Sequence, residues 1–269
     1  MRRWLLILCI CLAAPLAFAQ ENYPFCDGEV LTLSVMYKWG AINTEVGTAR
    51  LQLDSLNYEG EPAFHLGCKA WTAPFFDRFY KIREDLESWV RAKDLRPLRF
   101  TRSTYEGGYE ASNDFHYKWD EGYIDADVTF ENKGPQKLQI PLKEGEYDLI
   151  ALLYHIRRLD TSAYEKGATT KVRFAIDDNV FDVTIRAQGK ENIKIRKFGR
   201  LNAWHLSCSV VQGALFDGNE NLHLWLSADE NRIPVAAKVP LKVGAVRAWI
   251  CGWNGLKNPF DAWTDERKR

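Results

Sequence analysis

The sequence predicts an all-β, mainly antiparallel protein in which two similar meanders form one large curved sheet or open β-barrel. Three observations support this prediction. Short segments of alternating apolar and polar residues recur along the chain, turn sequences separate them at short intervals, and only one segment has the apolar spacing of a helix. The expected order is a first meander, the helix, and a second meander.

The first expected strand shows the alternation most clearly. From Leu31 to Trp39 every second residue is apolar or aromatic, and Gly40 ends the segment. Further strands are expected around residues 49–53, 64–70, 86–91, 98–101, 114–119 and 124–130, and after the helix around 172–176, 181–185, 193–195, 204–210, 222–226, 235–241 and 246–251. Turn sequences stand at 57–60, 106–108, 120–122, 132–135, 177–179, 188–189, 217–219 and 229–231.

The predicted helix spans residues 148–159. Its leucines and isoleucine form one continuous apolar stripe, Asp148 is placed to cap its start, and Arg157 and Arg158 stand where the helix dipole favours positive charge. Ile150, Ala151 and Tyr154 make a second apolar or amphipathic face. A helix that is apolar on two sides favours packing against or into the curved sheet, and a helix that fills the concavity would leave no room for a ligand.

The two β-rich halves, about 26–141 and 167–255, contain similar blocks in the same order. Residues 63–68 (AFHLGC) match 203–208 (AWHLSC), and 89–97 match 225–234 with one residue inserted. We interpret the blocks as an internal repeat whose halves are joined by the helix. The alternative is that similar strands independently acquired similar residues.

The first 19 residues predict a secretory signal peptide. Arg2 and Arg3 precede an apolar stretch that ends at Ala17-Phe18-Ala19, and that stretch is too short for a transmembrane anchor. We therefore expect a periplasmic or secreted protein that is not an integral membrane protein. Residues 20–260 are expected to form a single domain, followed by a charged C-terminal tail at 261–269.

The charge balance excludes a class of partners. The chain has 36 basic and 36 acidic residues, so no net positive field attracts nucleic acid or an anionic membrane. We also find no recognised catalytic or cofactor-binding motif, and thus expect no cofactor and no metal. His65 and His205 each precede a cysteine by three residues, which places the two side chains on opposite faces of a strand; we interpret both histidines as exposed strand residues.

Four cysteines follow the signal peptide: Cys26, Cys68, Cys208 and Cys251. An exported protein favours disulfides, although buried thiols and a metal site are the alternatives. We expect Cys26 to pair with Cys251 if the first and last strands are neighbours. Pairing of Cys68 with Cys208 is a further hypothesis, based on their equivalent positions in the repeat.

Aromatic residues gather in the break between the strands expected at 64–70 and 86–91. Core packing or cover of a sheet edge is the common role of such clusters; the alternative is a ligand-binding lip. The candidate ligand-binding residues are Trp71, Phe75, Phe76, Phe79, Tyr80, Tyr105, Tyr109 and Tyr154.

Several motifs resemble a family of exported bacterial proteins known as domain of unknown function 3108. They are Cys26-Asp-Gly-Glu29, the Tyr37-Lys-Trp-Gly40 strand, Gly47 with Ala49, the strand at 79–88, Glu106 to Tyr109, and Asp148 to Arg157. Ile150 stands where that family usually has serine. The resemblance brings no established activity or catalytic residue. More remotely, the hairpins with tryptophan and proline resemble those of LolA/LolB-type lipoprotein carriers, which are open half-barrels with an apolar concave face.

These observations lead to one main hypothesis and two alternatives. The main hypothesis is a non-enzymatic periplasmic binding or envelope-associated protein that holds a lipid or other hydrophobic molecule on the curved sheet. The alternatives are a module that binds another envelope protein, and a carbohydrate-binding or carbohydrate-active protein.

Overall fold

The computed structural model describes residues 22–130, 134–196, 198–210, 221–241 and 243–264. These residues form 15 strands, one α-helix and two short 3-10 helices, so the predicted fold class is confirmed. The predicted signal peptide, the turn expected at 217–219, and residues 132 and 133 of the turn expected at 132–135 lie outside the described residues.

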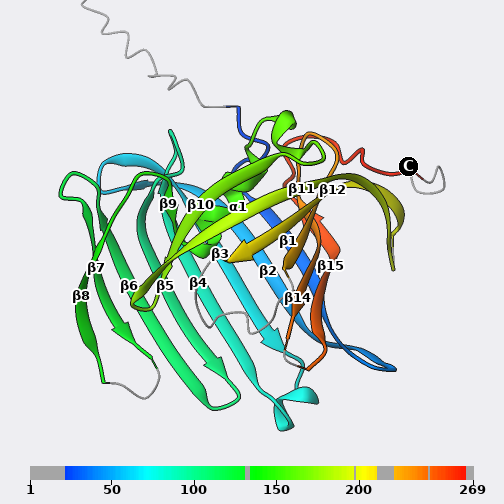
Figure 1. The fold of residues 1–269 in the computed structure, drawn as a ribbon, viewed down its shortest axis with the longest axis horizontal. Coiled ribbons are helices and arrows are strands. Elements are labelled where there is room, and N and C mark those ends of the chain that lie inside the picture. Colours follow the sequence, from blue (N-terminus) through cyan, green and yellow to red (C-terminus); the bar gives the residue numbers. More distant parts are fainter. Residues whose placement is uncertain (1–21, 131–133, 197, 211–220, 242, 265–269) are drawn as a thin grey trace, which may run out of the picture.

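The elements follow one another along the chain as labelled in Figure 1. The first half contains β1 (Glu29–Trp39), β2 (Ile42–Tyr58), β3 (Glu61–Thr72), η1 (Phe76–Arg78), β4 (Ile82–Arg91), β5 (Pro97–Glu106), β6 (Tyr109–Lys118), β7 (Tyr123–Thr129) and β8 (Gln136–Pro141). The second half contains β9 (Glu146–Tyr147), α1 (Leu149–Arg157), η2 (Thr161–Tyr164), β10 (Thr169–Ile176), β11 (Asn179–Ile195), β12 (Gly199–Val210), β13 (Leu222–Ser227), β14 (Pro234–Pro240) and β15 (Ala245–Asn254).

The described strands belong to a single sheet in the order β8-β7-β6-β5-β4-β3-β2-β1-β15-β14-β13-β12-β11-β10-β9. The last strand lies beside the first, which is the condition on which the Cys26–Cys251 pairing was expected, with Leu33 opposite Ile250 in an antiparallel pair. The two-residue β9 pairs in parallel with β10. Because the sheet bends strongly, β10 and β11 pass in front of β4 to β6 in Figure 1.

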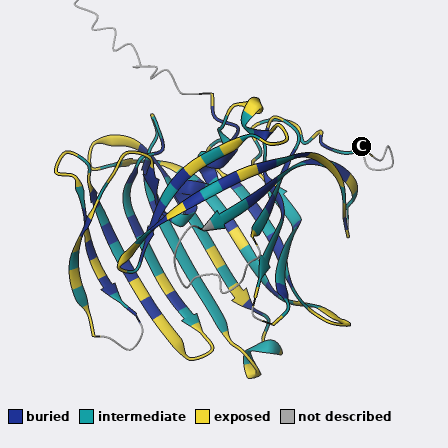
Figure 2. Cartoon of the chain, in the orientation of Figure 1, coloured by how far each residue is buried: buried dark blue, intermediate teal, exposed yellow. Residues whose placement is uncertain are grey.

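The alternation along each strand gives the sheet two different faces. We call the face turned toward α1 the inner face; on β3 it carries Phe64 and Leu66, which are 3% and 0% exposed. The residue between them, His65, points to the outer face because side chains alternate along a strand. Figure 2 shows the same alternation of burial along many strands.

The antiparallel order also gives the sheet two distinct ends. The turns β2–β3, β4–β5 and β13–β14 lie at one end, which we call the helix end because α1 contacts β3, β4, β9 and β10 there. The turns β1–β2, β3–β4, β5–β6 and β14–β15 lie at the opposite end, which we call the hairpin end. The hairpin end is at the bottom of Figure 1.

The hairpin of β10 and β11 folds over the inner face of β5 and β6. Asp177, in its turn, accepts hydrogen bonds from Arg102 Nη1 at 3.1 Å and from Asn113 Nδ2 at 3.0 Å. Ala175 and Val180, on either side of this turn, pack against Phe100 and Phe115. The contact holds the two arms of the curved sheet together far from the β1–β15 pair.

Three details differ from the sequence-based expectations. Strands β8 and β9 were not predicted, and most others extend beyond their predicted limits. Gln188–Gly189 is not a turn: β11 runs through it, and Gly189, at φ +95°, takes up an irregularity in the register. Residues 261–264 of the predicted tail are packed, since Ala262 is 3% exposed and Trp263 bridges to Leu201.

Candidate functional site

The helix α1 closes the helix end of the curved sheet. Ile150 and Ala151 donate backbone hydrogen bonds to Asp148 Oδ1 at 2.9 and 2.8 Å, so the predicted N-cap is confirmed. Ser88 Oγ, on β4, donates to the other carboxylate oxygen at 2.6 Å. The cap therefore fixes both the start of the helix and its position on the sheet. Burial raises the pKa of Asp148 to about 6 despite these hydrogen bonds.

A buried ion pair anchors the other end of the helix. Arg157 donates to both carboxylate oxygens of Glu29, at 2.6 and 2.8 Å, and to the backbone carbonyl of Asn231 at 3.0 Å. Both charged side chains are 0% exposed. Arg157 also lies over the rings of Phe25 and Tyr154, with its guanidinium carbon 5.1 and 5.0 Å from the ring centres.

Tyr154 is consequently not part of a ligand-binding surface. It is 0% exposed, and its ring packs edge-on against Phe25 with the centres 5.0 Å apart. The sequence grouped Tyr154 with the other candidate aromatics because it lies on the second apolar face of α1. That face is covered by the N-terminal segment that precedes β1, a contact that no local pattern announces.

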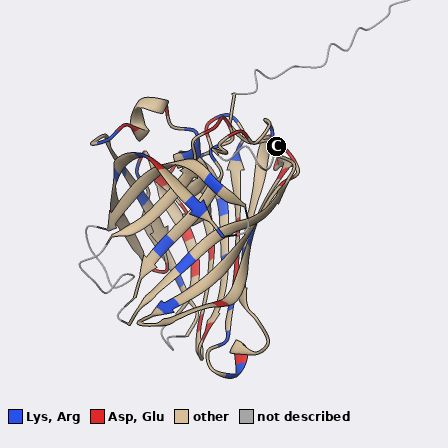
Figure 3. Cartoon of the chain, turned by 90° about the vertical axis from the view of Figure 1, so that its right-hand side faces the viewer, with Lys and Arg blue, Asp and Glu red and all other residues tan. Residues whose placement is uncertain are grey.

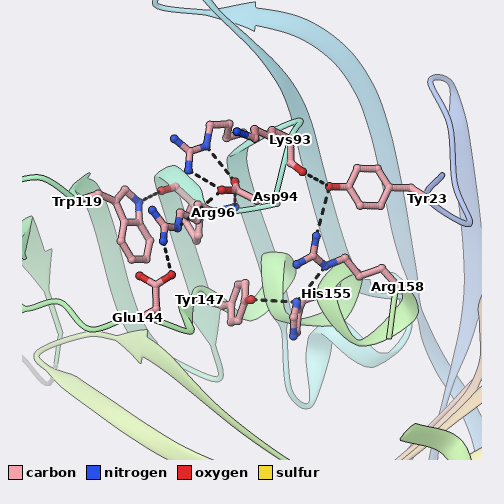
Figure 4. Close-up of polar contacts among 11 residues, drawn as sticks. Tyr23, Lys93, Asp94, Arg96, Trp119, Glu144, Tyr147, His155 and Arg158 are labelled. Carbon is pink, nitrogen blue, oxygen red and sulfur yellow. Dashed lines mark hydrogen bonds and ion pairs between the residues drawn. The ribbon is translucent and has the colours of Figure 1, made fainter. Parts of the chain in front are cut away.

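Polar contacts join α1 to the β4–β5 turn across the helix end (Figure 4). Tyr147 OH lies 2.9 Å from His155 Nδ1 and the two rings stack, while Arg158 Nη1 donates to Tyr23 OH at 3.4 Å. Tyr23 in turn donates to the carbonyl of Lys93 at 2.9 Å. Burial, with the Arg158 charge, lowers the pKa of His155 to about 4, so this imidazole is neutral at pH 7.

The same end is further tied together by ion pairs from the β4–β5 turn. Asp94 binds Arg91 at 2.5 Å and accepts from the backbone of Arg96, whose side chain pairs with Glu144. Trp119 Nε1 donates to the carbonyl of Pro97 at 2.7 Å. Figure 4 shows this group beside the helix contacts. We interpret these contacts as stabilising the fold at the helix end, because each of the polar side chains already has a protein partner.

The inner face changes character away from α1. Near the helix its side chains are large and fully buried, as Leu53, Leu66 and Val90 show at 0% exposure. Toward the hairpin end, the inner-face positions of β14, β15, β2 and β3 hold alanines that are only half-buried. The register places Ala237 opposite Ala248, and Ala49 opposite Ala70. Ala49, Ala237 and Ala248 pack against the apolar core, and all four alanines remain partly accessible to solvent.

The length of α1 explains why it covers only part of this face. A helix of nine residues is about 14 Å long, whereas the twelve residues of β3 extend about 40 Å. The main contacts of α1 with the sheet are with β3, β4, β9 and β10. The helix therefore lies across the helix end and is much shorter than the strands that it contacts.

Seven of the eight candidate aromatics gather at the hairpin end. Trp71 ends β3, Phe75, Phe76, Phe79 and Tyr80 surround η1, and Tyr105 and Tyr109 flank the β5–β6 turn. Tyr80 lies against Gly107 so closely that a Cβ at that glycine would be 2.2 Å from its ring. The sequence placed five of these residues in one break between strands and two beside a Gly-Gly turn, and the structure brings both groups to the same end. Their role in ligand binding stays a prediction.

Most of these rings face solvent, together with other large apolar residues at the same end. Nine large apolar side chains of the described residues are exposed by at least 36%, and all nine belong to turns of the hairpin end. This apolar rim consists of Trp39 and Ile42 on β1–β2, Trp71, Phe75, Phe79 and Tyr80 on β3–β4, Tyr109 on β5–β6, and Leu241 and Val243 on β14–β15.

The matching sequence blocks occupy equivalent positions on the outer face. His65 lies opposite Trp89 and stacks on it at 4.8 Å between ring centres; His205 lies opposite Trp225 and stacks at 4.4 Å. The register of both blocks shifts directly after the tryptophan. The two blocks thus share one local geometry.

The two histidines are less exposed than predicted. His205 is 12% exposed because Trp225 stacks on its ring. Its Nδ1 forms a hydrogen bond with Glu191 Oε1 at 2.7 Å. His223 Nδ1 lies 2.8 Å from His205 Nε2. The sequence missed this group because Glu191 lies on another strand, β11. Within the described residues, no group of three or more His, Cys, Asp or Glu is arranged to hold a metal ion.

The structure forms neither of the expected disulfides. All four cysteines are thiols. Cys26 donates to the carbonyl of Gly255 and Cys251 to that of Thr32, so the two sulfurs lie several residues apart along the β1–β15 pair. Cys68 and Cys208 point to the inner face from separate strands, and burial raises the pKa of each thiol to about 12.

A strongly curved antiparallel sheet with a helix across one end defines a β-barrel-like protein. A solved structure of this kind is similar: the crystal structure of a beta-barrel-like protein of domain of unknown function DUF1849 from Brucella abortus matches with a TM-score of 0.58. The identity is 9%, and the match covers 86% of this chain and 98% of that chain. At this identity the likeness shows the fold alone.

The chain belongs to the family described as protein of unknown function DUF3108, whose family model matches residues 34–249. The resemblance stated from the sequence motifs is therefore confirmed. The remoter resemblance to LolA/LolB-type carriers stays a prediction. No functionally curated protein matches the chain. Among the described residues, no helix is long and apolar enough to cross a membrane.

Proposed function

We propose that this protein is an exported, non-enzymatic binding protein that holds a lipid or another elongated hydrophobic molecule on the inner face of its sheet. The observation that supports the proposal is the row of half-buried alanines between α1 and the hairpin end. Burial of an alkyl chain against such a face contributes about 0.8 kcal/mol per CH₂ group.

The distribution of polar groups favours binding over catalysis. The strongly shifted titratable groups Asp148 and His155 lie at the helix end, where they cap α1 or contact Tyr147. The inner face beyond α1 combines half-buried alanines with polar groups on β4 to β6, where Thr104 Oγ1 donates to Glu84 at 2.8 Å and Arg102 pairs with Asp177. A polar group beside apolar side chains suits orientation of a ligand.

The experiment extracts the freshly purified protein with organic solvent and identifies released molecules by mass spectrometry. It also measures binding of a fluorescent fatty-acid analogue. We expect Ala49→Phe to reduce probe binding at least tenfold, because the new ring fills the inner face. The matched control is Arg50→Phe, the next residue on β2, which points to the outer face and is exposed.

Two outcomes would contradict the proposal. A wild-type protein that releases no apolar molecule and does not bind the fluorescent probe would have no hydrophobic ligand. Equal loss of binding in Ala49→Phe and Arg50→Phe would place the probe elsewhere. Both variants must first show the circular dichroism and thermal transition of the wild type, so that unfolding is not mistaken for loss of the site.

Export belongs to the same proposal and has its own test. It is supported by the residues that precede Gln20, where a charged start, an apolar stretch and Ala17-Phe18-Ala19 follow one another. Fractionation of cells that produce the full chain should recover a processed form outside the cytoplasm, with Gln20 at its N-terminus. A chain that stays in the cytoplasm with its first 19 residues intact would refute export.

A further inference from the structure

The apolar rim is confined to one end of the molecule. Its most exposed members are Phe79 at 74%, Phe75 at 63%, Trp39 at 54% and Val243 at 53%. The turns of the helix end carry no large apolar side chain that is exposed to this degree among the described residues. Soluble monomers rarely concentrate exposed apolar groups in this way unless the surface contacts something.

The structure holds the largest part of the rim in place. Asp77 pairs with Arg83, and Thr72 Oγ1 both donates to Asp77 and accepts from the backbone of Ile82. These contacts fasten the base of the β3–β4 loop. Phe75 and Phe79 stand beyond this base, 5.6 Å apart between ring centres. The loop that exposes these two rings to solvent is thus held in place by side-chain contacts at its base.

The charges that flank Phe79, the most exposed ring, are basic, whereas the acidic Glu106 lies near Tyr80. Arg78 and Lys81 are exposed next to Phe79 and Tyr80, and Lys38 precedes Trp39. The acidic residue of the loop, Asp77, is already paired with Arg83. Figure 3 shows charges of both signs on the strands, so this local excess is not a property of the whole surface.

We propose that the apolar rim docks on the surface of a phospholipid bilayer. Aromatic rings and aliphatic tips would enter the boundary of the acyl chains, to a depth of about 5–10 Å, while Arg78 and Lys81 meet lipid phosphates. The rim is spread over several separate turns (Figure 1), which a fluid bilayer can accommodate without a rigid complementary surface. In this orientation the hairpin end of the inner face turns toward the membrane.

This inference goes beyond the proposed ligand and does not depend on it, since vesicle binding can be measured on protein without a ligand. The experiment is flotation of the purified protein with phosphatidylcholine vesicles that contain 0 or about 30% phosphatidylglycerol, at low and high salt. We expect the wild type to float with both vesicles, and more strongly with the anionic ones at low salt.

Three variants separate the parts of the rim. Phe75→Ser with Phe79→Ser should lower the vesicle partition coefficient at least tenfold on both compositions. Arg78→Ser with Lys81→Ser should remove only the additional binding to anionic vesicles. Tyr123→Ser, at the β6–β7 turn of the helix end, is the matched control and should float like the wild type. Tyr123 is the first residue of β7 and the other substituted residues lie in the β3–β4 loop, so the circular dichroism spectrum should not change.

The proposal fails if the wild type does not float with either vesicle, or if Phe75→Ser with Phe79→Ser floats as well as the wild type. It also fails if the wild type dimerises through the rim. In that case sedimentation velocity would show a dimer that the double serine variant lacks, and the occupant would be a second copy of the chain. Failure here leaves the solvent extraction and fatty-acid binding results unaffected.

Discussion

At the residue scale, Glu29 and Arg157 form an ion pair in which both side chains are fully buried. Taking two charges out of water costs several kcal/mol per ion, which their contact and the carbonyl of Asn231 offset. We expect Glu29→Gln to destabilise the protein by about 3–5 kcal/mol, because it leaves the Arg157 charge buried without its partner. Urea unfolding of the purified variant measures the loss.

A double-mutant cycle distinguishes this account from simple loss of packing. Glu29→Leu combined with Arg157→Met removes both charges, and should be less destabilising than the sum of the two single substitutions. Additive losses would mean that the two side chains contribute independently.

Asp148 and His155 predict opposite pH dependences. Folding raises the pKa of Asp148 from 3.8 to about 6, so the folded state holds a proton that the unfolded state has lost, and stability falls as pH rises from about 4 to 6. Folding lowers the pKa of His155 from 6.5 to about 4, so stability falls as pH drops from 6.5 to 4. Each effect is on the order of 3 kcal/mol, and the two nearly cancel.

Single variants should uncover each dependence. His155→Gln leaves Asp148, so the free energy of unfolding should decrease between pH 4 and 6. Asp148→Asn keeps a capping side chain and leaves His155, so the free energy of unfolding should increase between pH 4 and 6.5. Urea titrations at four pH values measure both slopes. Slopes of the same sign in the two variants would show that at least one group does not titrate as described.

At the element scale, the contact between the start of β1 and the end of β15 limits which residues can follow the last strand. Gly255 has φ +66°, and a Cβ there would lie 2.2 Å from the carbonyl oxygen of Gly28. Gly28 has φ +80°, but a Cβ at Gly28 would have no other heavy atom of the described residues within 4 Å. Gly28→Ala should therefore cost only about 1 kcal/mol of left-handed strain, and Gly255→Ala clearly more, because the backbone must also move.

Thermal unfolding of the two glycine variants tests this difference. The comparison controls for the left-handed conformation, since both glycines adopt it. Equal losses of thermal stability for the two substitutions would mean that the backbone near Gly28 and Gly255 moves apart at no cost in free energy. That result would weaken the importance of this junction for the fold.

The elements themselves were largely predictable. The alternation in 29–39 and the cap-and-stripe pattern of 148–159 are local, and both segments form as expected. The strand β11 was divided in two, because Gln188–Gly189 has the composition of a turn and only its pairing with β12 shows a bulge. Strand β9 escaped detection because its two residues become a strand only through β10.

At the scale of the whole molecule, the thiol state of the cysteines can be tested directly. We expect alkylation of the denatured mature chain without reductant to modify all four cysteines, since none is disulfide-bonded. In the native protein at pH 8, Cys68 and Cys208 should resist alkylation, because burial raises their thiol pKa to about 12. Mass spectrometry counts the modified sites; two alkylated cysteines in the denatured chain would indicate a disulfide.

The candidate site shows the limit of sequence reasoning at this scale. Clustering of seven aromatics followed from their positions in two breaks, but their exposure depended on whether another part of the chain covers them. The contribution of Trp39 and Val243 to the same rim follows from the antiparallel order of the strands, which places distant turns at one end. The helix end shows the opposite case, where Tyr154 is covered by the N-terminal segment.

The sequence by itself determined the fold class, the helix with its cap and the family, since these depend on periodicity and short motifs. The tertiary structure alone decided which apolar residues are buried and which are exposed. It also decided that α1 lies across one end of the sheet, and that the four cysteines of the described residues lie apart. These properties depend on contacts between segments more than a hundred residues apart, as in the pair of Glu29 and Arg157, and such contacts leave no local pattern.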